Sequence, residues 1–299
     1  MLYQQITRNK RKTVIVMFSF TLLLMAAGGG AGILFADDFW PGCWLTLVIT
    51  LIYLAIVLPN PASMVMALNH AHEIHEKDNP TLWHIVEDMA MVARVPMPRV
   101  YVITDKSPNA FATGRDPQHA SVAVTQGLLD QLDREELEGV LGHEISHVRN
   151  YDILLSTISL VMVGVITWLA NFCSRWLFWG GSGRRSNNDR NDGGNVFEII
   201  KLVLVIFTLI LAPLAATLAQ LALSRNREYL ADASSVELTR NPQGLISALE
   251  KITKSQPMKE ADPSSAAMYF TNPFKKRTRA SWFDTHPSTP DRIARLKKM

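Results

Sequence analysis

The sequence contains little cysteine, little net charge and no internal repeat. Its two cysteines, Cys43 and Cys173, lie in or beside apolar runs, so free buried thiols are expected and no disulfide framework is indicated. Basic residues number 30 and acidic residues 27, which gives a net charge of +3 without a long basic tract. This balance argues against a nucleic-acid-binding protein.

Charged side chains are also missing from four long stretches of the chain. These stretches are Val14–Ala36, Phe39–Pro59, Ile153–Ser174 and Leu202–Ser224. A helix rises about 1.5 Å per residue, so each stretch could cross a hydrocarbon core of about 30 Å. A soluble protein of 299 residues has no room to bury four such helices. We therefore predict four transmembrane-type helices.

The residues that flank the first run predict its orientation. Residues 1–13 contain no acid, and their bases are Arg8, Lys10, Arg11 and Lys12. The turn that leads to the second run, Asp37-Asp38, contains no base, so the positive-inside rule predicts a cytoplasmic N-terminus. The first run ends without an A-x-A site and the second run follows at once, which argues against a cleavable signal peptide.

The connection between the third and fourth runs does not fit the same rule. Residues 175–201 carry five bases, which are Arg175, Arg184, Arg185, Arg190 and Lys201. A spanning hairpin would place these bases outside, so the sequence leaves open whether the hairpin crosses the membrane or only enters its inner leaflet. Residues 179–195 are rich in Gly, Asn and Ser, and this composition predicts a mobile loop.

The other segments have the character of a globular α+β protein. Alternating or short apolar stretches predict strands at 99–104, 109–114 and 120–125, in a small antiparallel sheet. Helical spacing predicts helices at 80–95, over about 17 residues after an N-cap at Asp133, at 225–253 with a break at Asn241-Pro242, and at 290–298. The expected parts are two membrane helices (1–59), a catalytic part with the sheet (60–152), the apolar hairpin (153–224) and a second catalytic part (225–299).

The helix predicted after Asp133 carries the stretch HEISH, with His143, Glu144 and His147. Histidines four residues apart lie on one face of a helix, where both imidazoles can bind one zinc ion. Glu144 would lie beside the open coordination position, where it can take a proton from zinc-activated water and pass it to the leaving amine. The alternative is a solvated helix face that happens to bear two histidines.

A catalytic zinc site also needs a third protein ligand. The downstream candidates are Asp152, Glu228, Asp232, Glu237, Glu250 and His286. Glu228 is best placed, because its predicted helix, SRNREYLADASS, directly follows the fourth run. Asp232, one turn later on the same face, is predicted to accept the free N–H of a zinc-bound histidine. If the third and fourth runs pair as a hairpin, they bring His143, His147 and Glu228 together at the membrane surface.

Two further histidine motifs need an interpretation. His286, in DTHPSTPDRI, is predicted to stabilise an oxyanion or to occupy the open position of zinc in a resting state, and the alternative is an anchor for its loop. Residues 70–76, HAHEIHE, place His72 and His75 only three residues apart. We interpret this segment as the polar face of a helix that leaves the membrane.

Four motifs occur in a fixed order along the chain: NAFATG, GHEISHVRNYD, SRNREYLADA and THPSTPDRI. With two apolar runs between the second and third motifs, and an apolar pair at the N-terminus, they resemble the bacterial HtpX-type membrane proteases of the M48 metallopeptidases over nearly the whole chain. The resemblance implies a membrane α+β fold with a mainly helical, gluzincin-like zincin domain. It also implies one zinc ion per chain, held by His143, His147 and Glu228, with Glu144 as the catalytic glutamate and Asp232 behind the ligands.

The resemblance further implies a multi-pass protein of the bacterial plasma membrane with a cytoplasmic catalytic domain. Its substrates would be misfolded or damaged membrane proteins, hydrolysed in quality control. Asn109–Ala112 resembles the segment beside the cleft, where an extended substrate could add as a strand and be read through its backbone. Lipid and unfolded proteins are therefore the expected partners, nucleic acid is not, and the oligomeric state stays open.

Two other functions compete with proteolysis. Zinc could staple a non-catalytic membrane scaffold that binds unfolded segments. However, structural zinc usually has four protein ligands, often cysteines, and both cysteines here are far from the histidines in the sequence. A lipid or small-molecule hydrolase would fit the zinc chemistry but not the strand-like segment at Asn109–Ala112.

Overall fold

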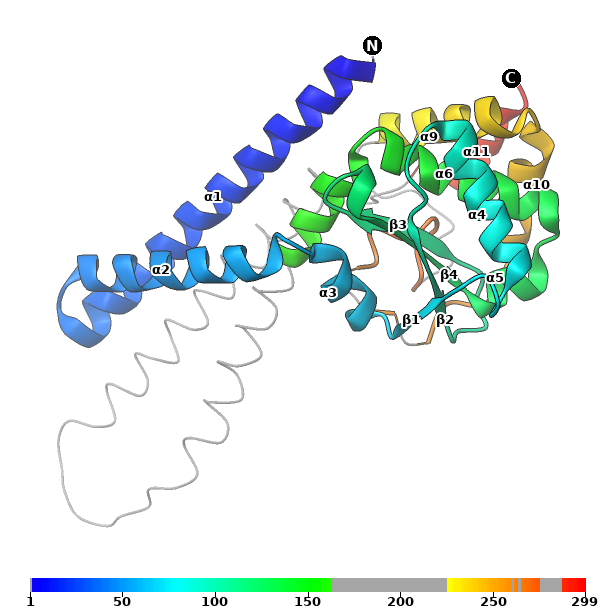
Figure 1. Cartoon of the computed structure of the whole chain (residues 1–299). Helices are drawn as coiled ribbons and strands as arrows, with labels where there is room; N and C mark the ends of the chain where they lie inside the picture. Colours follow the sequence, from blue (N-terminus) through cyan, green and yellow to red (C-terminus); the bar gives the residue numbers. More distant parts are fainter. Residues whose placement is uncertain (1, 163–224, 260, 263–264, 275–286) are drawn as a thin grey trace. The chain divides into compact units, whose positions relative to one another are not determined.

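The computed structural model describes residues 2–162, 225–259, 261–262, 265–274 and 287–299 (Figure 1). It comprises two compact units, the first made of Met1–Ile15, Val57–Val161 and Ala219–Met299, the second of Val16–Ile56 and Met162–Leu218. The predicted fourth run and the predicted mobile loop at 179–195 lie outside the described residues. Of the third run only the start is described, within the helix Asp152–Met162.

Two helices of the described chain are long and apolar enough to cross a membrane. They are Thr7–Gly30, within α1 (Leu2–Ala36), and α2 (Phe39–Val57), and they match the first two predicted runs. In the second unit these helices meet at Gly28 and Gly42, where a Cβ built on Gly42 would lie 2.0 Å from the Gly28 oxygen. Large apolar side chains of α2 are exposed, as lipid contact requires, among them Trp44, Leu45, Ile49, Ile52 and Ile56.

The first unit is built on a four-stranded mixed sheet. Its strands are β1 (Ala71–Ile74), β2 (Arg99–Ile103), β3 (Ala110–Gly114) and β4 (Ala120–Thr125), in the order β1-β2-β4-β3. β1 pairs antiparallel with β2, and β3 antiparallel with β4, but β2 and β4 are parallel. The three predicted strands are confirmed, and the purely antiparallel arrangement was wrong. Alternation of side chains indicates which face is buried and does not indicate which strand becomes the neighbour.

The histidine-rich segment 70–76 is also a correction. It forms strand β1 and not a helix, with His72 opposite Val102 of β2. The chain turns into this strand at His70, whose φ is 51°. His72 and His75 are exposed and, among the described residues, do not belong to the group that could hold a metal ion.

The two faces of the sheet are covered differently. The face that carries Val100, Ala112 and Val122 shares one hydrophobic core with α4 (Pro80–Ala93), α6 (Arg134–Arg149) and α10 (Pro242–Lys254). The opposite face, with Tyr101, Phe111 and Ala123, packs on α3 (Pro61–Leu68), Leu160 of the apolar helix, and Met258, Ala261, Met268 and Tyr269. Both faces are therefore buried, which makes β3 and β4 buried at every position.

Helix α6 begins at the predicted N-cap. The Asp133 side chain accepts from the Glu136 N–H and the Glu136 side chain accepts from the Asp133 N–H, which together form a capping box. α9 (Arg225–Thr239) packs beside α6, and Ser235 of α9 donates to the Gly139 oxygen at 2.6 Å. The predicted break at Asn241-Pro242 is confirmed, since α10 starts there. The remaining short helices in the described part of the chain are α5 (Gln126–Gln131), η1 (Pro117–His119) and α11 (Thr289–Leu296).

Candidate metal centre

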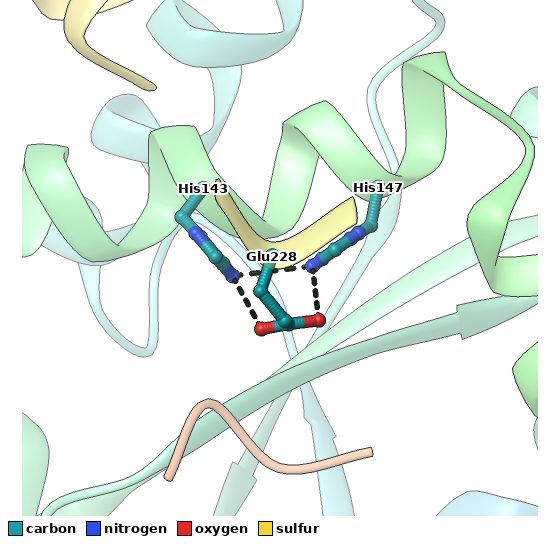
Figure 2. A group of neighbouring side chains, drawn as sticks. All are labelled: His143, His147 and Glu228. Atoms are coloured by element: carbon teal, nitrogen blue, oxygen red, sulfur yellow. Dashed lines mark hydrogen bonds and ion pairs between the residues drawn. The ribbon is translucent and has the colours of Figure 1, made fainter. Parts of the chain in front are cut away.

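Helices α6 and α9 bring together three side chains that can bind a metal ion. His143 and His147 project from α6, and Glu228 faces them from the first turn of α9 (Figure 2). The two Nε2 atoms are 3.1 Å apart, and the Glu228 carboxylate oxygens lie 3.6 Å from Nε2 of His143 and 3.7 Å from Nε2 of His147. Within the described residues this is the group with metal-ligand geometry, its ligand atoms lying within 4.8 Å of one another.

A buried carboxylate orients the first histidine. Asp232 Oδ1 lies 2.9 Å from Nδ1 of His143, and Arg292 of α11 holds this carboxylate through Nη2 at 2.6 Å and Nε at 2.9 Å. Burial would raise the pKa of the Asp232 carboxyl, but Arg292 and His143 outweigh burial and lower that pKa to about 2. Asp232 is therefore an anion that can only accept, so Nδ1 of His143 donates.

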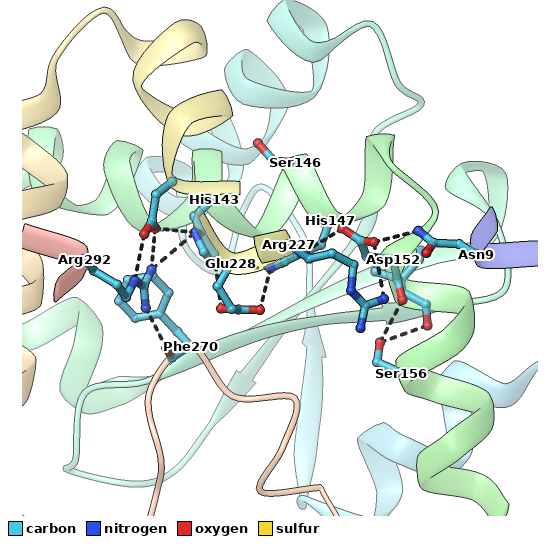
Figure 3. Close-up of polar contacts among 12 residues, drawn as sticks. Asn9, His143, Ser146, His147, Asp152, Ser156, Arg227, Glu228, Phe270 and Arg292 are labelled. Atoms are coloured by element: carbon cyan, nitrogen blue, oxygen red, sulfur yellow. Dashed lines mark hydrogen bonds and ion pairs between the residues drawn. The ribbon is translucent and has the colours of Figure 1, made fainter. Parts of the chain in front are cut away.

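A second carboxylate orients the other histidine. Asp152 Oδ2 lies 3.1 Å from Nδ1 of His147, while Asp152 Oδ1 faces Asn9 Nδ2 at 2.7 Å and Arg227 Nη1 at 3.5 Å (Figure 3). Asp152 was a candidate third ligand in the sequence. In the structure it faces the ring nitrogen that points away from the three converging ligand atoms.

The donor set fits a metal cation. Because both Nδ1 atoms donate to carboxylates, each Nε2 presents a lone pair, and the two lone pairs converge with the Glu228 carboxylate. Such an arrangement of acceptors is stable only around a positive charge. Burial lowers the pKa of His143, but its hydrogen bonds to Asp232 and Glu228 outweigh burial and raise it to about 9, because these carboxylates favour a positive charge at the ring. Two imidazoles and one carboxylate are a common ligand set of catalytic zinc.

Glu144 lies in the same pocket but outside the ligand group. Its side chain is buried, and it lines the pocket with the three ligands and with Ala112 of β3. Burial raises the pKa of the Glu144 carboxyl, and the neighbouring Glu228 carboxylate raises it further. The backbone of Ala112 lowers the pKa of the Glu144 carboxyl in turn, and both residues line the same pocket, so the edge strand of the sheet lies beside this glutamate.

The chain's own segment 267–270 forms another wall of the pocket. The Phe270 N–H donates to the Ala110 oxygen of β3 at 2.7 Å, so one position of the strand edge is already paired. The guanidinium of Arg292 stacks 4.4 Å from the centre of the Phe270 ring and donates to the Phe270 oxygen at 3.2 Å. This segment therefore joins the C-terminal helix to the sheet beside the metal ligands.

The remaining predicted site residues have different outcomes. Glu237 and Glu250 are exposed on α9 and α10 and take no part in the ligand group. His286 lies outside the described residues. Sequence reasoning missed Arg292, although its position one turn before the buried Leu296 places it on the inner face of α11. No sequence signal marked Asn9, whose partners lie 141 and 143 residues away.

An HExxH helix, a glutamate from a second helix and an adjoining sheet edge define the class of HExxH metallopeptidases. Residues 76–299 match the family described as Peptidase family M48. The chain is 64% identical to "Protease HtpX homolog" of Lactobacillus helveticus and 63% identical to that of Lactobacillus acidophilus, each over 300 residues and 100% of both chains. The crystal structure of S. mikatae Ste24p shares 19% identity and a TM-score of 0.50, covering 98% of this chain and 67% of that chain, which shows a common fold.

The chain belongs to peptidase family M48. It is a membrane-associated metalloprotease, a hydrolase whose substrates are proteins, and zinc is the metal typical of its family. The resemblance predicted from the four motifs is confirmed.

Proposed function

We propose that this protein is a zinc endopeptidase in which His143, His147 and Glu228 hold one zinc ion per chain and Glu144 transfers protons. The observation that carries the proposal is the convergence of these three ligands beside Glu144, a buried carboxyl in the same pocket that does not belong to the ligand group. When bound, zinc supplies a Lewis acid that polarises the peptide carbonyl and makes water a nucleophile near neutral pH.

The residues of the chain supply the positioning and the proton transfers. Asp232 and Asp152 each hold one imidazole by its Nδ1–H, which keeps both Nε2 lone pairs directed at the same point. Glu144, with a raised pKa, accepts a proton from the attacking water and returns it to the leaving amide nitrogen. His286 is proposed to act on the oxyanion or at the open metal position, as the sequence indicates.

The proposed substrates are unfolded or damaged membrane proteins, cleaved on the cytoplasmic side of the bacterial plasma membrane. Support comes from the two apolar helices of the described chain, from the basic residues that precede the first, and from the strand edge beside Glu144. A substrate that adds to β3 near Asn109–Ala112, at the backbone positions that Phe270 leaves open, is held through its backbone, so many sequences are accepted. The proposed parts are a membrane pair at 1–59, catalytic parts at 60–152 and 225–299, and the hairpin at 153–224.

Glu144→Gln in the full-length chain tests the proposal. The amide cannot take a proton, so cleavage of an unfolded membrane protein should fall by at least about 100-fold, whereas zinc content should stay at one ion per chain. Glu138→Gln, a change at a half-buried position on the same helix, is the matched control and should cleave like the parent.

Two results would contradict this account. Undiminished cleavage by Glu144→Gln would remove the mechanism. A parent that binds zinc and cleaves no unfolded substrate would favour the non-catalytic scaffold instead.

A further inference from the structure

The start of helix α1 makes a specific polar contact with the catalytic part of the first unit. Asn9 is 5% exposed although its neighbours Arg8, Lys10 and Arg11 are exposed. Its Nδ2 donates to the Asp152 carboxylate at 2.7 Å and to the Asn150 oxygen at 3.3 Å. Both acceptors lack a proton to give, so they determine which end of the Asn9 amide faces them.

The hydrogen bonds of Asn9 connect α1 to the turn that follows the HExxH helix. Asn150 ends α6, Tyr151 has a φ of 59°, and Asp152 begins the next helix. Lys10 Nζ adds a second contact, 4.7 Å from the centre of the Tyr151 ring. A left-handed residue between two helices is costly for a side chain as large as tyrosine, so its neighbours must hold it in place.

The other side of Asp152 faces the metal ligand. Its Oδ1 accepts from Asn9, and its Oδ2 faces Nδ1 of His147 at 3.1 Å (Figure 3). His143 is held by the equivalent chain of contacts, in which Arg292 fixes Asp232. The Arg292 guanidinium makes two hydrogen bonds to Asp232. Asp152 has no equally close arginine, because Arg227 lies 3.5 Å from it. Among the described residues, the short hydrogen bond from Asn9 is therefore the main restraint on Asp152 Oδ1.

We propose that Asn9 is a positioning residue for the metal centre: through Asp152 it fixes the ring of His147 and so raises metal affinity and turnover. This inference rests on the proposed function, in which His147 is a zinc ligand. It assigns a role in the metal site to α1, the helix that also carries the first candidate membrane span. A residue that only docked α1 would affect stability without changing the coordination of a bound metal.

Asn9→Leu keeps the shape of the side chain and removes its hydrogen bonds. In the full-length protein, the zinc dissociation constant measured by chelator competition should rise about tenfold, as expected for a partner behind a metal-bound histidine. The visible spectrum of the Co²⁺-loaded variant should differ from that of the parent, and kcat should fall more than KM rises. Asn9→Gln retains an amide donor and should recover part of the affinity, and Asn9→Ala serves if the leucine variant does not fold.

Thr13→Val is the matched control. Thr13 is 4% exposed and lies one turn further along the same face of α1. Its hydroxyl donates to the backbone oxygen of Asn9 at 3.0 Å and does not contact Asp152. This variant should keep the parent's zinc affinity and cobalt spectrum even if it is less stable. If Asn9→Leu has the same zinc dissociation constant and the same cobalt spectrum as the parent, the inference about Asn9 is wrong, but the proposed protease function is unaffected. A parent that binds no zinc would overturn the proposed function, and the inference with it.

Discussion

Buried charges next to the metal ligands impose the strictest requirements on individual residues. Arg292 is 2% exposed, and Asp232, its partner, is equally buried. A guanidinium is tolerated there because its planar N–H groups match the carboxylate. In addition, the Phe270 ring stacks on it and the Phe270 backbone oxygen accepts a hydrogen bond from it. Removing one member would leave an uncompensated charge in the interior, which typically costs about 3–5 kcal/mol.

Glu136, the capping residue of the HExxH helix, should make stability depend on pH. Burial alone would raise the pKa of its carboxyl, but hydrogen bonds from Lys251 and Ser247 outweigh burial and lower it below the usual 4.5. The folded state therefore gains stability from this carboxylate above about pH 4.5. That gain is lost as the pH falls through the lowered pKa.

Glu136→Gln should lower the free energy of unfolding at pH 7 by about 1–3 kcal/mol, since hydrogen bonds to a charged group are lost. The difference from the parent should shrink below pH 4.5, which thermal unfolding at several pH values would show. Glu138→Gln removes only an exposed pair with Arg134 and should change stability by less than about 1 kcal/mol. A pH-independent difference for Glu136→Gln would contradict the assigned ion pair.

Sequence reasoning found the residues whose chemistry is local and missed those whose role depends on distant partners. His143, Glu144 and His147 are recognisable because one helix carries them at metal-binding spacing. Asn9 and Arg292 act through residues 143 and 60 positions away, and a single sequence contains no pattern that links such pairs.

At the scale of elements, close packing of small residues joins the two apolar helices of the second unit. Gly42→Ala would place a methyl group 2.0 Å from the Gly28 oxygen, a backbone atom that cannot move away without shifting a helix. We expect this change to lower the stability of the protein in detergent by about 1–3 kcal/mol, measured as a lower thermal unfolding midpoint.

Gly30→Ala is the matched change on the same helix as Gly28. No described atom lies within 4 Å of a Cβ built at Gly30, and alanine favours helix over glycine by about 1 kcal/mol. Its unfolding midpoint should equal or exceed that of the parent. Equal losses for Gly42→Ala and Gly30→Ala would show that the helices do not pack through Gly28 and Gly42.

The positions of strands and helices were predicted better than the order in which the strands pair. The strands at β2, β3 and β4 and the capped start of α6 follow from side-chain alternation and capping chemistry near in sequence. The parallel pairing of β2 with β4 could not be predicted. It depends on where β3, which lies between them in the sequence, is placed in the sheet. β1 was missed because four residues show too little alternation to distinguish a strand from a helix face.

At the scale of the whole molecule, a membrane-associated chain assembles a candidate metal site from its own helices. Two of the ligands come from one helix, and the third, Glu228, lies 81 positions after His147 in the sequence. Glu144 lines the same pocket as these three residues, and the chain belongs to peptidase family M48.

The central claim is that His143, His147 and Glu228 bind one zinc ion. Zinc K-edge X-ray absorption on the full-length protein, with metal content determined on the same sample, tests it most directly. The account predicts one zinc per chain with two imidazole nitrogens at about 2.0–2.1 Å and a carboxylate oxygen that disappears in Glu228→Ala. A parent without zinc, or a zinc shell that Glu228→Ala leaves unchanged, would contradict it.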